Sequence, residues 1–214
     1  MRHGEVDNPT GVLYGRLPGF QLTPLGRAMA ECVAEYLVEG GRDITQVTAS
    51  PLLRAQQSAL PTAEAYDLPV DTDPYLLEAE SAFQGVNVNR NRWSLFHPQH
   101  WRLYGRPLEP SWGEPYEQIL SRMKVAISAA IDEAWGHEAL LVSHQLPIVT
   151  VQRFVQGKRL SHNPLNRECS LASLTSLLFD NHTLVGWSYS EPAAQLVQLA
   201  RDVTPGNSTA ATHS

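Results

Sequence analysis

The stretch Glu138-Ala139-Leu140-Leu141-Val142-Ser143 is a short, almost unbroken apolar run in which apolar and polar residues do not alternate. Such a run is typical of a strand buried on both faces of a parallel sheet. Amphipathic helices are predicted on both sides of it. The earlier helix repeats apolar residues every three or four positions and ends before Gly136, and the later one runs from about Pro147 to Gly157. This succession of helix, buried strand and helix indicates an α/β domain.

The same alternation extends toward the amino terminus. Thr23-Pro24 reads as the start of a helix, with an N-cap residue followed by a first helical residue, and Gly40-Gly41 ends that helix. A β-type run over residues 47–50 leads into a second helix, and residues 68–71 are predicted to form a short edge strand. The whole pattern predicts a three-layer α/β/α sandwich with a mainly parallel central sheet.

The remaining segments complete one predicted domain, residues 1–202. Two β-type runs, 173–179 and 184–190, predict a hairpin that closes one edge of the sheet. Residues 83–112 are rich in arginine and aromatic side chains, lack clear periodicity and are longer than an ordinary connection, so we interpret them as a lid insertion. Residues 203–214, rich in Thr, Ser, Gly and Ala, are predicted to be a disordered tail.

Composition narrows the class of protein. The chain has 214 residues, 43% of them hydrophobic, and a formal net charge of -6, which argues against a nucleic-acid-binding protein. Cys32 and Cys169 cannot make a disulfide framework and are interpreted as core residues in a reducing compartment. No apolar run approaches the roughly 18 residues of a membrane span. We therefore expect a cytoplasmic protein with no membrane partner.

Three motifs carry candidate chemistry. Arg2-His3-Gly4-Glu5 opens the chain, Ser50-Pro51 precedes a helix with Arg54 in its first turn, and Ser143-His144 ends the buried strand. Taken singly, they have ordinary interpretations as an exposed loop, a surface helix residue and a hydrogen-bonded core histidine. In this order, from Arg2 to beyond His144, they resemble the histidine phosphatase superfamily, also called the phosphoglycerate mutase-like superfamily. The resemblance implies the phosphoglycerate mutase-like fold.

The resemblance also implies a phosphoryl-transfer site without a metal or another cofactor. His3 would attack the phosphorus as a neutral imidazole and form a phosphohistidine that water then cleaves. Arg2 and Arg54 would bind phosphate oxygens through their planar N–H donors, with the helix amino terminus adding to the site of Arg54. His144 would lie opposite His3 and hold a phosphate oxygen, mainly as an imidazolium.

The leaving alkoxide needs a proton, which a carboxyl group can supply. Leu76-Leu77-Glu78 resembles the family's Leu-x-Glu element, so we assign the general acid to Glu78. Glu80, two residues further on, is the alternative, and we expect it to point to the other side of the segment.

Further candidates are possible substrate-binding residues: Asn8, Arg16, Arg90 and Arg92. Four arginines of the lid could bind a second anionic group of the substrate, or they could form an exposed solvated face: Arg90, Arg92, Arg102 and Arg106. His97 and His100 could lie on one helical face as metal ligands, but no third ligand is apparent, so no metal site is predicted.

The sequence departs from the family at three places. After the first motif, the family's Asn and Asp near the phosphate are poorly reproduced, since Asn8 is offset by one position and Gly19 stands where Asp is common. The other two places are the start of the chain and the residue after His144. Only Met1 precedes Arg2, where the family has a central strand, and a sheet that lacks this strand would leave backbone groups unpaired. We therefore expect the natural chain to start upstream of Met1. Gln145 follows the second histidine, where many relatives have glycine; this changes the turn and leaves the histidine.

These observations predict a phosphomonoester hydrolase that acts on small phosphorylated metabolites through a phosphohistidine at His3. A phosphoglycerate mutase-type phosphotransferase is the alternative within the enzyme class. A protein that binds a phosphorylated ligand without catalysis is the alternative outside it. The sequence leaves the substrate and the oligomeric state open.

Overall fold

The computed structural model describes residues 1–86, 113–163 and 167–200. The lid segment 87–112 and the tail 203–214 lie outside these ranges. The helices and strands follow in the order α1 (Pro24–Glu39), β1 (Ile44–Ala49), α2 (Leu53–Ala65), β2 (Asp71–Thr72), η1 (Pro74–Leu76), α3 (Tyr116–Glu133), β3 (Glu138–Val142), α4 (Gln145–Val155), β4 (Leu174–Asp180), β5 (Thr183–Ser190) and α5 (Ala194–Val197).

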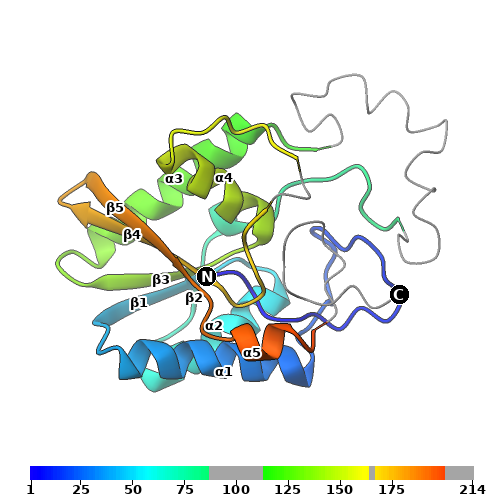
Figure 1. Cartoon of the computed structure of the whole chain (residues 1–214), viewed down its shortest axis with the longest axis horizontal. Coiled ribbons are helices and arrows are strands. Elements are labelled where there is room, and N and C mark those ends of the chain that lie inside the picture. Colours follow the sequence, from blue (N-terminus) through cyan, green and yellow to red (C-terminus); the bar gives the residue numbers. More distant parts are fainter. Residues whose placement is uncertain (87–112, 164–166, 201–214) are drawn as a thin grey trace.

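A parallel sheet with the strand order β2-β1-β3 forms the middle layer. Helices α1, α2 and α5 cover one face of it, while α3 and α4 lie on the other (Figure 1). This arrangement confirms the predicted α/β class and its three layers. The predicted edge strand is present at the edge of this sheet, although β2 covers only Asp71–Thr72.

Helix α1 begins as its sequence predicts. The Thr23 hydroxyl accepts a hydrogen bond from Gly26 N (2.9 Å), and Pro24 takes the first helical position, where its missing N–H costs nothing. The buried side of α1 carries Met29, Ala30 and Val33, all without solvent exposure, and it packs against α2. This apolar stripe is what fixes the helix on the sheet layer.

The predicted hairpin is confirmed: β4 and β5 pair in antiparallel fashion. Residues 1–3 connect this hairpin to the parallel sheet by hydrogen bonds on both of their sides. On one side, Ser143 N donates to Met1 O (2.9 Å) and His3 N donates to Ser143 O (3.2 Å). On the other side, Arg2 N donates to Ser173 O (3.0 Å). Residues 1–3 therefore lie between the parallel sheet and the hairpin and are bonded to both.

Strands β3 and β4 do not pair with each other within the described part of the chain. A groove of about 1210 Å³ lies between them instead, lined by Met1, by strands β3 and β4 and by residues of α1 and α3. The Met1 amino group donates to Leu141 O (2.8 Å) at one end of this groove. Burial lowers the pKa of that amino group to about 6. The groove thus separates the edge of β3 from the edge of β4.

Both cysteines are free thiols, with Cys169 buried and Cys32 partly buried, as expected. In the described ranges, no helix has the length and apolar character needed to span a bilayer.

Candidate active site

The candidate site residues come from the carboxyl ends of neighbouring strands. His3 follows the short central segment, His144 follows β3, and Arg54 lies in the first turn of α2 just after β1. Ligands of open α/β sheets bind at this edge. Arg2, His3, Arg54 and His144 are all at most 2% exposed, and we call them the arginine–histidine cluster.

The two histidine rings lie close together, with 5.2 Å between their centroids and 59° between their planes. His3 Nδ1 lies 2.8 Å from Gly4 O, and a carbonyl oxygen only accepts, so Nδ1 carries the proton of the neutral ring. Burial, with the guanidinium groups of Arg54 and Arg2, lowers the pKa of His3 well below its ordinary value. The ring is therefore neutral near pH 7, and its lone pair is on Nε2, as a nucleophile requires.

Gly4 is required because the backbone at this position lies directly against the start of α1. A Cβ atom at position 4 would lie 2.3 Å from Gly26 O, and one at position 26 would lie 2.1 Å from Glu5 O. The two glycines allow the chain after His3 to cross the start of α1 in direct backbone contact. Gly4 N also donates to Ser58 Oγ (3.0 Å), which donates in turn to Arg54 O (2.7 Å). Ser58, which the sequence analysis did not single out, thus ties the histidine segment to the helix of Arg54.

Arg54 is held by neutral groups. Its Nη2 donates to Gly15 O (2.7 Å), and its guanidinium carbon lies 4.7 Å from the centre of the Tyr14 ring. Its Nε is buried and lacks a hydrogen-bond partner within the described ranges. Arg2 Nη1 donates to Cys169 O at 2.5 Å. The cluster therefore concentrates positive charge and donor groups around two neutral imidazoles.

His144 is neutral in this setting. Its Nε2 lies 2.8 Å from the hydroxyl of Ser50, and its Nδ1 is buried with no partner among the residues described. Burial, followed by the charges of Arg54 and of neighbouring groups, lowers the pKa of His144 well below its ordinary value. The imidazolium form expected from the resemblance therefore needs an anion beside the ring. Ser50 is a further site residue, because it orients this histidine.

Glu78 and Glu80 have different surroundings, although residues two apart in a regular extended segment point to the same side. The Glu80 side chain is 69% exposed and pairs with Arg16, at 2.7 Å between Oε1 and Nη1. Glu78 is half-buried, and its carboxylate is close enough to Arg54 to favour the charged guanidinium. Of the two candidates, Glu78 is thus the one that the structure brings toward the arginine–histidine cluster.

Two of the possible substrate-binding residues, Asn8 and Arg16, lie in the described part of the chain, and both bond to protein groups. Asn8 closes its own loop, since its side chain bonds both N (3.2 Å) and O (2.9 Å) of Val12. Arg16 bonds the segment around Glu78 and is considered below. Arg90 and Arg92, like His97 and His100, lie outside the described residues. Within the described ranges, no group of three or more metal-ligating side chains is present.

Gln145, the departure after the second histidine, is buried at the start of α4. Its Oε1 accepts from Arg167 Nη1 (3.3 Å), and Arg167 Nε lies 3.0 Å from His162 Nε2. The side chain that replaces the family's glycine therefore connects the helix after His144 to the segment that leads into β4. Sequence patterns gave no signal for Arg167 or His162.

Comparison with known proteins defines the class. Residues 1–189 match the model of the histidine phosphatase superfamily (branch 1), and the chain belongs to that superfamily of phosphoryl-transfer enzymes. It is 50% identical over 194 residues to the uncharacterized protein Rv0525 of Mycobacterium tuberculosis, covering 91% of this chain and 95% of that protein. It is also 33% identical over 157 residues to the probable phosphoglycerate mutase GpmB of Yersinia enterocolitica, covering 69% of each.

Solved structures share the fold. The mycobacterial glucosyl-3-phosphoglycerate phosphatase Rv2419c, in complex with VO3, superposes with a TM-score of 0.69 at 23% identity, covering 89% of this chain and 94% of that one. A putative α-ribazole-5'-P phosphatase from Escherichia coli superposes with a TM-score of 0.67 at 23% identity, covering 86% and 91%. At this level of identity, the likeness establishes the fold alone.

Proposed function

We propose that the protein is a phosphomonoester hydrolase of small phosphorylated metabolites that works through a phosphohistidine at His3. The observation that carries this proposal is the bond from His3 Nδ1 to Gly4 O, which leaves the lone pair of the neutral ring on Nε2. The ring centre of His3 lies 5.2 Å from the ring centre of His144. The two buried arginines beside these rings supply the positive charge that a transferring phosphoryl group needs.

The reaction proceeds in two displacements. His3 Nε2 forms a bond to phosphorus while the bond from phosphorus to the ester oxygen breaks, and Glu78 gives its proton to the departing alkoxide. Glu78, now a carboxylate, then takes a proton from water as that water attacks the phosphohistidine. Inorganic phosphate leaves, His3 recovers its lone pair, and Glu78 is protonated again. Arg2, Arg54 and His144 hold the phosphoryl oxygens in both steps.

The test uses p-nitrophenyl phosphate with wild-type protein and His3→Ala. Wild type should release p-nitrophenol, and His3→Ala should lose roughly 10⁴-fold or more of this activity, because no other group replaces the nucleophile. A rapid quench followed by mass spectrometry should find one phosphoryl group on the peptide that contains His3. His182→Ala, at an exposed histidine of the β4–β5 turn, is the matched control and should keep full activity. Equal background rates in wild type and His3→Ala would instead indicate a phospholigand-binding protein without catalysis.

A mutase activity is the second candidate, favoured by the 33% identity to the probable phosphoglycerate mutase. A mutase returns the phosphoryl group to a bound acceptor hydroxyl, whereas a hydrolase gives it to water. Incubation with labelled 3-phosphoglycerate separates the two. We expect the label in free phosphate, as hydrolysis requires. Label at the 2-position of the product would instead show that the protein is a mutase.

A further inference from the structure

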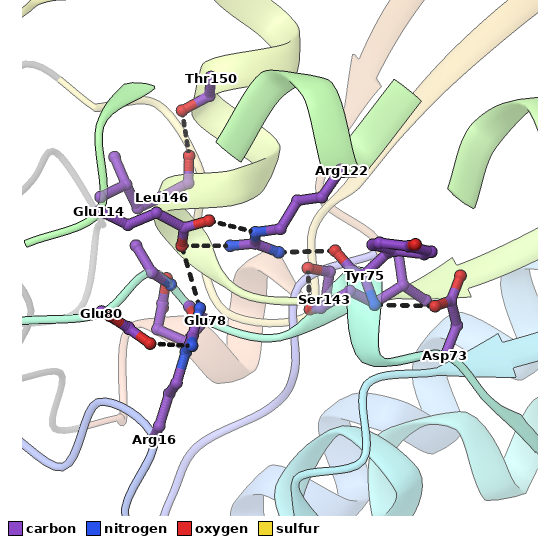
Figure 2. Close-up of polar contacts among 12 residues, drawn as sticks. Arg16, Asp73, Tyr75, Glu78, Glu80, Glu114, Arg122, Ser143, Leu146 and Thr150 are labelled. Atoms are coloured by element: carbon purple, nitrogen blue, oxygen red, sulfur yellow. Dashed lines mark hydrogen bonds and ion pairs between the residues drawn. The ribbon is translucent and has the colours of Figure 1, made fainter. Parts of the chain in front are cut away.

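One carboxylate, that of Glu114, binds two arginines that reach it from different parts of the chain (Figure 2). Its Oε2 lies 3.0 Å from Arg16 Nη2, while its two oxygens accept from Nε (2.8 Å) and Nη2 (3.1 Å) of Arg122. The side chains of Glu114 and Arg122 are each only 11% exposed. A mostly buried two-pronged pair of this kind is directional and little screened by salt. We call Arg16, Glu114 and Arg122 the Glu114 clamp.

Both arginines of the clamp also donate hydrogen bonds to the main chain around Glu78. Arg16 Nε donates to the carbonyl oxygen of Glu78 itself (2.6 Å), and Arg122 Nη1 donates to Tyr75 O (2.6 Å). These two carbonyls lie three residues apart, one on each side of Leu76-Leu77. The segment that ends in Glu78 is therefore held at both of its ends by guanidinium groups that share one carboxylate.

The main chain fixes Glu114 against the same segment. Glu114 N donates to Glu80 O (3.2 Å), and Gly113 forms an antiparallel bridge with Ser81. A Cβ atom at position 113 would lie 1.9 Å from Glu80 O, so a larger residue would push the two chains apart. Ser143 Oγ adds a bond to Leu76 O (2.7 Å), which joins the segment to the residue before His144. The position of the segment is thus defined relative to the arginine–histidine cluster.

We propose that Glu114 is a positioning residue that orients Glu78 for proton donation, acting through Arg16 and Arg122. The inference rests on the proposed function, in which the Glu78 carboxyl protonates the leaving oxygen. Glu114 touches no reacting atom in this scheme. A proton donor must reach the leaving oxygen at hydrogen-bond distance, and a displacement of about 1 Å can cost on the order of 10²-fold in rate. Two guanidinium contacts to the backbone, one at Tyr75 and one at Glu78 itself, are suited to prevent that displacement.

The test compares two aryl phosphates of similar size on Glu114→Gln. p-Nitrophenolate is a good leaving group that needs little protonation, whereas the more basic phenolate from phenyl phosphate depends on the general acid. We expect kcat/KM for phenyl phosphate to fall about tenfold, and that for p-nitrophenyl phosphate to fall less than about threefold. Because each variant is compared with itself on two substrates, a change in the folded fraction cancels. Glu117→Gln, an exposed carboxylate in the first turn of α3, is the matched control and should leave both values unchanged.

Glu78→Gln separates failure of this inference from failure of the proposed function. It should produce a larger difference between the two substrates, roughly 10²-fold, and adding Glu114→Gln to it should not widen that difference. If Glu78→Gln slows both substrates equally, Glu78 is not the general acid, and both proposals are overturned. If Glu78→Gln separates the substrates but Glu114→Gln lowers both equally or neither, the proposed function stands and the positioning role is wrong.

Discussion

Arginine is used in two ways in this molecule, at the arginine–histidine cluster and at the Glu114 clamp. In the clamp, each guanidinium faces a carboxylate within 3.1 Å and also binds a carbonyl oxygen. In the cluster, Arg54 binds a carbonyl oxygen and faces an aromatic ring, and it forms no ion pair with the carboxylates of the described residues. Burying a charge without a countercharge is costly.

The difference teaches how to distinguish arginines that hold the fold from arginines that await a ligand. Charge that is neutralised within the protein stabilises the protein, while charge that is left over stabilises whatever anion enters. Arg54 is an arginine of the second kind, and it lies with Arg2 beside two neutral histidines, so the positive charge of the cluster suits an anion such as a phosphate group. The same contrast predicts opposite effects of mutation in the two regions.

Among the arginine variants, Arg54→Met should have the largest effect on activity and little effect on stability. Loss of one guanidinium from a phosphoryl-transfer site should reduce kcat/KM for p-nitrophenyl phosphate by about 10³-fold. The free energy of unfolding should stay within about 1 kcal/mol of wild type or rise, because an unpaired buried charge is replaced by an apolar chain. Kinetics and urea unfolding measure the two quantities. An activity loss below tenfold would contradict the ligand role of this charge.

Arg122→Met should reverse that profile. It leaves the mostly buried Glu114 with one arginine and Tyr75 O without its donor, so we expect unfolding to become easier by about 2–3 kcal/mol. Activity toward p-nitrophenyl phosphate should change only a few-fold. Arg42→Met is the matched control, since its ion pair with Glu138 is largely exposed and should contribute less than about 1 kcal/mol. Equal stability of the two variants would remove the distinction between the regions.

The neutral histidines of the cluster should make stability depend on pH. The folded-state pKa values of His3 and His144 are lowered, so as pH falls through about 6.5 the unfolded chain takes up protons that the folded chain does not. Stability should therefore be highest above pH 7 and fall below 6.5, with each such histidine contributing a slope of about 1.4 kcal/mol per pH unit. Urea unfolding at pH 7.5 and 5.5 measures this. The double variant His3→Ala, His144→Gln should flatten the profile, and an unchanged slope would show that the charge state of the cluster is assigned wrongly.

A bound phosphate should reverse the charge preference of His144. An anion beside the ring favours the imidazolium, so binding should be accompanied by proton uptake, and affinity should rise as pH falls, by at most about tenfold per unit. Calorimetry of phosphate binding in buffers with different ionisation enthalpies counts the protons. His144→Gln should take up fewer protons than wild type at the same pH, and this comparison cancels the titration of phosphate itself. Equal uptake in both proteins would rule out His144 as the acceptor.

Local patterns in the sequence predicted the α/β class, the start of α1 and the hairpin, because each depends on residues that are close together in the chain. The order of the three motifs predicted that His3, Arg54 and His144 share one site. The clamp could not be predicted in this way, since Arg16, Glu114 and Arg122 carry no spacing signal and meet only in the folded chain. Arg16 was expected near a substrate, but its donors are used on Glu78 O and on two carboxylates.

The state of the histidines was also beyond the sequence. Their neutrality results from burial next to arginines, which is a property of the assembled site and not of any motif. The structure also shows a direct approach of Gly4 to Gly26 of α1. Close contacts between backbones of distant segments leave no local pattern in a sequence.

Residues 1–3 are bonded to Leu141, Ser143 and Ser173, partners that lie about 140 to 170 positions later in the chain. During synthesis those partners are added long after residues 1–3, and contacts between residues so far apart in the chain form late in folding. Residues 1–3 therefore lack these backbone partners until most of the chain has been synthesised. We therefore expect the arginine–histidine cluster to be complete only after synthesis has passed Ser173, the last of these partners in the chain.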